Sequence, residues 1–132
     1  MIVGFTGTRQ IDKISEARLS MLATLLELHS LDYDGAIVIH GCAYGTDTFC
    51  HERCLQYNIP IIGRPSISGN SNLTGFEKLY PPEAPLKRNK KIVDDCDILI
   101  ALPINKNVEE LRSGTWSTIR YAKSKGKKII II

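Results

Sequence analysis

The stretch DILIALP, residues 97–103, carries the pattern that decides the fold. Its apolar residues follow one another without alternating with polar ones, which is typical of a strand covered on both faces. Similar short apolar runs occupy residues 2–5 (IVGF), 36–40 (AIVIH), 59–63 (IPIIG) and 127–132 (KKIIII). Strands of this kind belong to parallel sheets with helices on each side.

Helical patterns fill most of the space between these runs. We predict helices over residues 14–29, 46–57, 85–95 and 113–124, with Pro85 in a first turn and Gly126 ending the last helix. Residues 64–84 and 104–111 show no sustained period and are expected to be loops. The order predicts an α/β, Rossmann-like open parallel sheet of about five strands with helices on both faces. We expect the last strand to lie inside the sheet or against a partner, because an exposed isoleucine-rich edge promotes aggregation.

Length and composition indicate one ordinary globular domain spanning residues 1–132. The chain has 43% hydrophobic and 23% charged residues, which argues against disorder. Its net charge of +3 is too small an excess to indicate a nucleic-acid partner, although it would suit a small anionic ligand. No apolar run reaches membrane-spanning length and no signal-like segment begins the chain, so we expect a cytoplasmic protein without membrane contact.

The four cysteines, Cys42, Cys50, Cys54 and Cys96, are expected to be free thiols in a reducing compartment. Cys50 and Cys54 lie four residues apart on a predicted helix with His51 between them, which raises the possibility of a zinc site. No CxxC pair accompanies them, so small buried side chains are the preferred interpretation, and no metal or cofactor is predicted.

Four unusual segments follow predicted strands. They are TGTR (6–9), HGCAYGTD (40–47), GRPS (63–66) and PINKNVEELRSGTW (103–116). In an open parallel sheet, ligands bind outside the carboxyl ends of the strands, where the strand order reverses. We therefore expect these segments to share one edge of the sheet and to form a ligand site.

The chemistry of these segments suits phosphate. Gly-Thr pairs at predicted helix starts would present free backbone amides, hydroxyls and the positive end of a helix dipole. Helix capping would explain any single Gly-Thr pair equally well, but the pairs recur along the same edge. The candidate ligand-binding residues are Thr6, Gly7, Thr8, Arg9, Gly41, Gly45, Thr46, Asp47, Arg64, Arg88, Arg112, Ser113, Gly114 and Thr115.

Among the charged candidates, guanidinium groups match phosphate oxygens in two-point contacts. Arg9 and Arg112 are favoured over ordinary surface arginines because each sits in a glycine loop. Asp47 either complements a helix dipole or accepts a hydrogen bond from a ribose hydroxyl or a loop amide. The candidate catalytic residues are Asp47, Arg88, Glu109 and Glu110. Trp116 is expected to pack against the sheet rather than stack on a base, and His40 to polarise a ligand or hold a turn.

The motifs GFTGTR, HGCAYGTD, LKRNKKIVDDCDILIALP and RSGTW together resemble the SLOG superfamily of Rossmann-like nucleotide-binding domains. That superfamily includes the lonely-guy phosphoribohydrolases, the DNA-processing protein A domain and small bacterial or phage proteins. The resemblance implies a nucleotide-binding fold, with Arg88 near the place of the family arginine. Thr118 occupies the position of the catalytic glutamate of the hydrolase branch, and threonine can neither stabilise a sugar cation by charge nor activate water as a base.

Three functions remain open. The first is a sensor or sequestering module that binds a nucleotide or nucleotide-derived phosphorylated ligand without altering it. The second is an N-glycosidic hydrolase or transferase acting on nucleotides, which requires a carboxylate from Asp47, Glu109 or Glu110. The third, a DNA-associated domain, is disfavoured by the modest charge and the lack of aromatics interleaved in a basic stripe. Superfamily members often pair through helices beside the site, so a homo-oligomer, a dimer or larger, is also expected.

Overall fold

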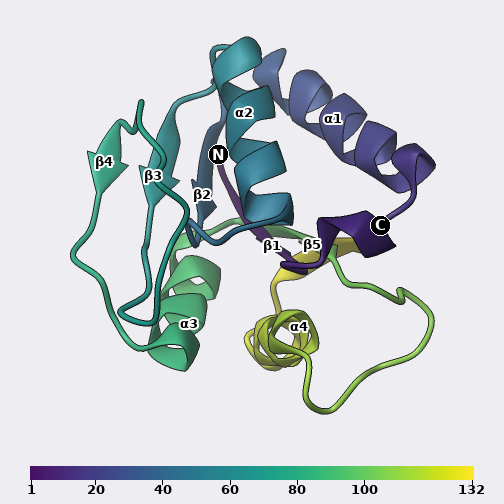
Figure 1. Ribbon diagram of the computed structural model, residues 1–132. Coiled ribbons are helices and arrows are strands. Elements are labelled where there is room, and N and C mark those ends of the chain that lie inside the picture. Colours follow the sequence, from purple (N-terminus) through teal and green to yellow (C-terminus); the bar gives the residue numbers. More distant parts are fainter.

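The centre of the protein is a six-stranded, entirely parallel sheet, seen in a computed structural model that describes residues 1–132 (Figure 1). Its strands are β1 (Ile2–Gly7), β2 (Ile37–His40), β3 (Ile61–Gly63), β4 (Lys78–Leu79), β5 (Ile98–Leu102) and β6 (Lys128–Ile131). They lie side by side in the order β4-β3-β2-β1-β5-β6. The predicted open parallel sheet is confirmed. The additional strand, β4, pairs with β3 inside the segment that was predicted to be a loop.

Four helices cover the sheet, α1 (Glu16–Ser30) and α2 (Thr46–Gln56) on one face and α3 (Pro85–Asp95) and α4 (Gly114–Ser124) on the other (Figure 1). A short 3-10 helix, η1 (Ile11–Lys13), precedes α1. The hydroxyl of Ser15 caps α1 and that of Ser113 caps α4, each accepting a hydrogen bond from a first-turn amide. No helix is long and apolar enough to cross a bilayer.

The sheet is buried on both faces, which explains the unbroken apolar runs in the sequence. All five residues of β5 are buried. On the α1–α2 side, Phe5 and Ile100 pack with Leu22 and the neighbouring core, whereas Leu99 contributes to the layer beneath α3 and α4. Successive residues of a strand point to opposite faces, so a strand with apolar neighbours on both sides needs apolar side chains at every position.

The last strand does not lie inside the sheet. β6 pairs in parallel with β5 alone, from Ile98↔Lys128 to Ala101↔Ile131, and forms the rim of the sheet opposite β4. The expectation of an interior position is therefore wrong. The alternative part of that expectation, a partner against the strand, stays a prediction.

The strand order reverses at β1. The chain first builds outward from β1 through β2 and β3, and then returns to place β5 on the other side of β1. Connections that depart in opposite directions leave a crevice between them at the carboxyl ends of the strands. The segments after β1 and β5 therefore border an opening in the surface.

Candidate functional site

A cleft of about 450 Å³ occupies this crevice, between the first turns of α3 and α4. It brings together segments that follow β1, β2 and β5, as expected of the carboxyl edge. Of the predicted site residues, those that line it are Thr6, Gly7, Thr8, Arg9, Gly41, Asp47, Arg88, Arg112, Ser113, Gly114 and Thr115, together with Glu110. Gly45, Thr46, Arg64 and Glu109 are not part of its wall.

The start of α4 offers backbone donors to the cleft. The hydroxyl of Ser113 accepts a hydrogen bond from the amide of Trp116 at 3.2 Å. The amides of Gly114 and Thr115 precede any intrahelical acceptor and donate to no other group of the protein. Both residues line the cleft beside Arg112. Unpaired amides at the positive end of a helix dipole favour an anionic group at this position.

Arg88 enters the cleft from α3 as a buried and almost fully bonded cation, with 6% of its surface exposed. Its Nη1 donates to the carbonyl oxygens of Gly41, at 2.5 Å, and Arg64, at 3.2 Å. Its Nε donates to Oδ1 of Asn89 at 2.7 Å. The remaining nitrogen, Nη2, has no protein acceptor and is not among the buried unpaired atoms, so it is open to the cleft that Arg88 lines.

Asp47 lies across Gly41 from Arg88. Its Oδ2 accepts a hydrogen bond from the amide of Ala43 at 3.1 Å, and the side chain is buried. Burial raises the pKa of the Asp47 carboxyl from 3.8 to about 6, against the opposing effects of the Ala43 amide, the Arg88 charge, the Gly41 amide and the more distant charge of Arg9. Arg88 in turn has a pKa lowered by burial and supported by Asp47.

Gly41 is needed at this point because of the space that its neighbours occupy. A Cβ atom on Gly41 would lie 2.7 Å from Nη1 of Arg88 and 3.1 Å from Oδ2 of Asp47. A side chain here would push apart two groups that face the cleft. This glycine therefore permits the close approach of a buried cation and a buried carboxyl group to the same point of the backbone.

The glycine and threonine at the start of α2 serve packing. The amide and the hydroxyl of Thr46 both donate to the carbonyl oxygen of Thr8, at 3.1 and 2.7 Å. Gly45 has a φ of 82°, and a side chain there would overlap the carbonyl oxygen of Arg9. A side chain on Gly7 would overlap the hydroxyl of Thr46. The expectation that α2 presents free amides is therefore wrong at Thr46, because these residues join the end of β1 to α2.

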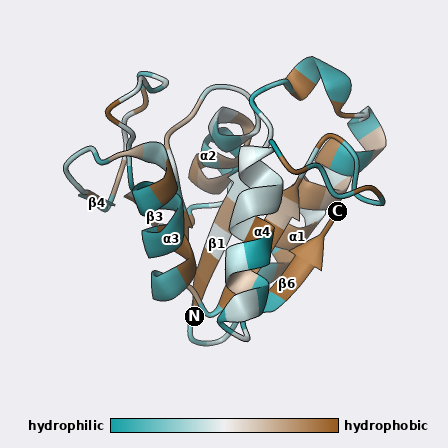
Figure 2. Ribbon diagram, turned by 90° about the horizontal axis from the view of Figure 1, so that it is seen from below, coloured by the Kyte–Doolittle hydropathy of each residue, from teal (hydrophilic) through white to brown (hydrophobic).

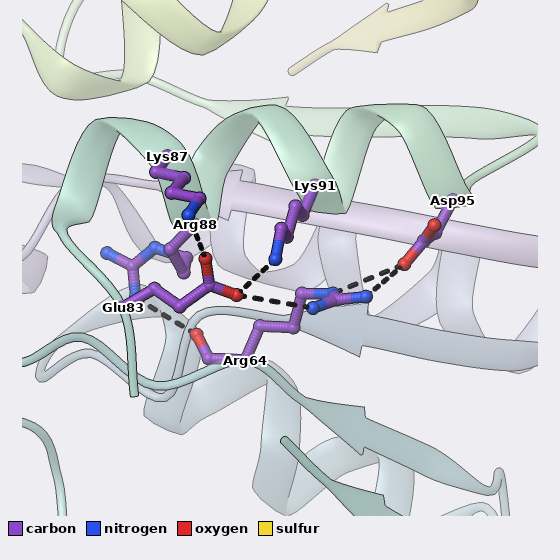
Figure 3. A network of polar contacts seen from close by, with 6 residues as sticks. All are labelled: Arg64, Glu83, Lys87, Arg88, Lys91 and Asp95. Carbon is purple, nitrogen blue, oxygen red and sulfur yellow. Dashed lines mark hydrogen bonds and ion pairs between the residues drawn. The ribbon is translucent and has the colours of Figure 1, made fainter. Parts of the chain in front are cut away.

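Arg64 takes part in a network beneath α3 instead of the cleft (Figure 3). Its Nη2 lies 2.6 Å from Oδ2 of Asp95, and its guanidinium stacks over the ring of Tyr80 at 3.7 Å. Glu83 pairs with Lys91 at 2.6 Å in the same network. The link from Arg64 to the cleft is indirect, through its carbonyl group and Arg88.

The carboxylate candidates after β5 have different surroundings. Glu110 lines the cleft, whereas Glu109 is outside its wall and pairs with Arg120 at 3.0 Å. Thr118, which the resemblance aligned with the glutamate of the hydrolase branch, is buried and donates its hydroxyl hydrogen to the carbonyl oxygen of Gly114 at 2.9 Å. Trp116 packs with Ala101 in the core, as expected, and its Nε1 bonds the carbonyl of Asn105.

His40 lies behind the cleft and holds a turn. Its Nδ1 accepts from the amide of Cys42 at 3.0 Å, and its Nε2 lies 2.9 Å from Nδ1 of His51. Nε2 of His51 lies 2.6 Å from the carbonyl oxygen of Thr74. These partners require a hydrogen on Nε2 of each ring. Burial and the neighbouring charges of His51 and Arg88 lower the pKa of His40 to about 3.

Sequence reasoning predicted Arg88 of α3 as a site residue but missed the other residues that this helix contributes. Pro85, Leu86, Asn89 and Ile92 line the cleft. The helix itself was predicted, but its placement beside α4 depends on tertiary packing. The nearest sequence signal was the adjacency of Asn89 to Arg88, because an amide beside a buried arginine can fix its guanidinium.

The comparisons with known proteins support the fold. No family model and no curated protein sequence matches the chain. A molybdenum cofactor binding protein from Rippkaea orientalis superposes with a TM-score of 0.73 at 20% identity, over 98% of this chain and 74% of that one. A Moco carrier protein from Chlamydomonas reinhardtii gives 0.73 at 16% identity, over 99% and 75%. DNA processing protein A from Streptococcus pneumoniae gives 0.70 at 18% identity, over 98% of this chain but 49% of that one.

These neighbours have SLOG-type Rossmann-like folds, so the resemblance read from the sequence is confirmed at the level of the fold. The chain spans about half of the DNA-processing protein and about three quarters of the two cofactor proteins.

Proposed function

We propose that this protein binds a small phosphorylated, nucleotide-derived ligand in the cleft, as a sensor or a sequestering module. The main observation that supports this proposal is that several hydrogen-bond donors without protein partners lie close together. The amides of Gly114 and Thr115 and the free Nη2 of Arg88 border one cleft. Arg9 and Arg112 add exposed positive charge to the same wall.

The donors match a phosphoryl group better than a neutral ligand. A helix start and guanidinium groups offer hydrogen-bond donors only, and phosphate oxygens are acceptors. The cleft of about 450 Å³ falls in the range typical of small-molecule sites, about 300–1,000 Å³. Its apolar wall, from Leu86, Ile92 and Ile104, would cover the less polar part of such a ligand.

The fold neighbours support a binding role. Two of them are a molybdenum cofactor binding protein and a Moco carrier protein, so this fold can hold a small molecule. A neighbouring DNA-processing protein from Helicobacter pylori binds single-stranded DNA. For the present chain, a net charge of +3 favours a small anion over a polynucleotide. We expect the cytoplasm as its compartment, since all four cysteines are free and buried.

A second candidate is cleavage of an N-glycosidic bond, and Asp47 is the observation that favours it. A carboxyl group with a pKa of about 6 beside a cleft can hold or release a proton near neutral pH. Glu110, on the same cleft, would be the second carboxylate. Against it stands Thr118, whose hydroxyl is buried and bonded within its own helix.

One experiment separates the two candidates. The protein is incubated with nucleoside monophosphates, cyclic dinucleotides and ADP-ribose derivatives, its thermal stability is measured, and the products are separated by chromatography. Stabilisation by a phosphorylated ligand without turnover is the expected result, and release of free base would establish hydrolysis instead. No stabilisation by any phosphorylated compound would overturn the binding proposal.

Arg112→Ala tests the placement of the ligand. It should abolish the thermal shift while the unliganded melting temperature stays unchanged, because Arg112 is exposed and makes no bond within the protein. Lys106→Ala is the matched control, because Lys106 is an exposed cation of the same loop that lies outside the cleft. An unchanged ligand shift in Arg112→Ala would remove Arg112 from the site.

A further inference from the structure

The rim strand β6 leaves one row of backbone groups unpaired. Ile132 donates its N–H to the carbonyl of Ala101. This bond establishes which residues of β6 direct their backbone N–H and C=O groups toward β5 and which direct them outward. In a parallel ladder every second residue bonds a given neighbour, so Lys128 and Ile130 face β5. The N–H and C=O groups of Ile129 and Ile131 therefore point away from the sheet, and no other element pairs with them.

The two rims of the sheet differ in their protection. At the opposite rim, β4 has two exposed residues, begins with Lys78 and is followed by Pro81 and Pro82. Short length, lysine and proline are the usual means of keeping an edge strand from pairing. β6 also begins with a lysine, Lys128, but it has four residues against the two of β4 and contains no proline, and Figure 2 shows it as a hydrophobic arrow with no strand beyond it.

An exposed apolar stripe lies on the same flank of the molecule. Arg18 of α1 reaches across the ends of β5 and β6, bonding the carbonyls of Pro103, Ile104 and Ile132. In a helix, residues three, seven and ten positions after a given residue lie on the same side as that residue. Counted from Arg18, these are Met21, Leu25 and Leu28, which therefore lie on the β6 side of α1. Met21 is 47% exposed and Leu28 57% exposed. The open strand and the stripe thus adjoin.

We infer that this flank is the interface of a twofold dimer, in which β6 pairs antiparallel with β6 of a second copy. With the twofold axis at Ile130, Ile129 of one copy lies opposite Ile131 of the other. These are the residues whose N–H and C=O groups point outward, so each pair can exchange both backbone hydrogen bonds.

A second copy fits this flank better than an unrelated strand. Antiparallel pairing about Ile130 places Lys128 opposite Ile132, so the lysines at the start of the two strands stay apart. The axis runs perpendicular to the joined sheet, so the α1 helices lie on the same face and their apolar stripes meet. Both features of the flank are therefore buried by one symmetric, closed contact.

The test is the mass in solution of the full chain by light scattering over a concentration series. The expected mass is twice the 14.7 kDa of one chain. Ile131→Pro removes an outward N–H and should yield monomers, whereas Ile131→Val keeps that N–H and should remain a dimer. A wild-type protein that is monomeric throughout the series would overturn the proposal.

A second pair of variants tests the same interface in case Ile131→Pro does not fold. Met21→Lys should weaken the dimer at least about tenfold, since it buries charge in the interface. Leu55→Lys on α2 is the matched control, because Leu55 is 46% exposed on an element away from β6. Circular dichroism and thermal melting establish that each variant is folded. A dimer that survives both Met21→Lys and Ile131→Pro with folded chains would contradict an interface at β6.

Discussion

The carbonyl oxygen of Gly41 accepts a 2.5 Å hydrogen bond from Nη1 of Arg88, and the α-carbon of the same glycine faces the carboxyl group of Asp47. A buried cation and a buried acid thus meet at a residue that has no side chain. The relationship links the end of β2 to α3 and orients the one free nitrogen of Arg88 toward the cleft.

Gly41→Ala should disable the cleft. The added methyl group would lie 2.7 Å from Nη1 of Arg88, so the guanidinium must move and give up bonds to carbonyl oxygens. We expect a loss of about 1–3 kcal/mol in the free energy of unfolding and at least about a tenfold loss of ligand affinity. Gly114→Ala is the control for stability alone, because it also borders the cleft but a methyl group there meets no protein atom within 4 Å. Denaturant titration measures stability and calorimetry measures affinity, and an unfolding free energy that is the same in the two variants would contradict this role of Gly41.

Asp47 should make stability depend on pH. Its pKa of about 6 in the folded protein exceeds the ordinary 3.8, so its protonated form favours folding. The contribution of Asp47 to the free energy of unfolding is fully present below pH 4. It is lost as the pH rises through 6, and the total loss is about 3 kcal/mol. As the pH rises over this interval, Asp47→Asn should become increasingly stable relative to wild type, as measured by the free energy of unfolding. A difference that stays constant from pH 4 to pH 7.5 would show that Asp47 is not perturbed.

Ligand affinity should follow the same titration. A negative charge on Asp47 repels a phosphoryl group, so binding should strengthen as the pH falls through 6. The probe should be a phosphodiester such as a cyclic dinucleotide, because its own charge is constant in this range. Asp47→Asn should bind with an affinity that no longer changes with pH. Retention of the wild-type pH dependence in this variant would assign it to another group.

Protonation of His40 should destabilise the protein in acid. The pKa of His40 in the folded protein, about 3, lies below the ordinary 6.5. Its contribution to stability is present at neutral pH and declines as the pH falls from about 6.5 toward 3, opposite in sign to that of Asp47. Nitrogen-15 NMR at pH 7 should find both rings with the hydrogen on Nε2, which His40 donates to Nδ1 of His51 and His51 donates to the carbonyl oxygen of Thr74. Hydrogen on Nδ1 of either ring would contradict the bonding described.

Arg120 should hold the loop that carries Glu110 and Arg112. Its guanidinium pairs with Glu109 at 3.0 Å and donates to the carbonyl of Leu111 at 3.3 Å. Arg120→Ala should accelerate amide hydrogen exchange in residues 105–112 and weaken ligand binding by roughly three- to tenfold, with little change in stability. Glu109→Gln keeps the bond to Leu111 and should have a smaller effect. Unchanged exchange in Arg120→Ala would show that the loop is held by other contacts, such as Trp116 with Asn105.

The fold was readable from the sequence because burial determines its pattern. The predicted helix 85–95 coincides with α3, and the strand around residues 97–103 contains β5. β4 was missed, since its residues Lys78 and Leu79 are exposed and have no periodic neighbours. The hydrophobic pattern of the sequence predicts strands well where both of their faces are covered. It predicts poorly a two-residue strand that is recognised only by its pairing with a neighbouring strand.

The candidate site was less readable, because the same residue types serve packing and binding. Gly45 and Gly114 each precede a threonine. Glycine is required at position 45 by its φ of 82° and by the nearby carbonyl group of Arg9, whereas Gly114 borders the cleft and has room for a side chain. Arg64 was grouped with the cleft arginines, although its partner Asp95 lies 31 residues away in sequence. Only tertiary structure separates these cases.

The contacts of Arg18 also constrain how the chain folds. This side chain, near the beginning, bonds carbonyl groups at residues 103, 104 and 132, and β1 lies between β2 and β5. β1 therefore gains its second neighbour only when β5 is in place, and the contacts of Arg18 form only when β6 has packed beside β5. Contacts between residues so far apart in sequence predict slow folding.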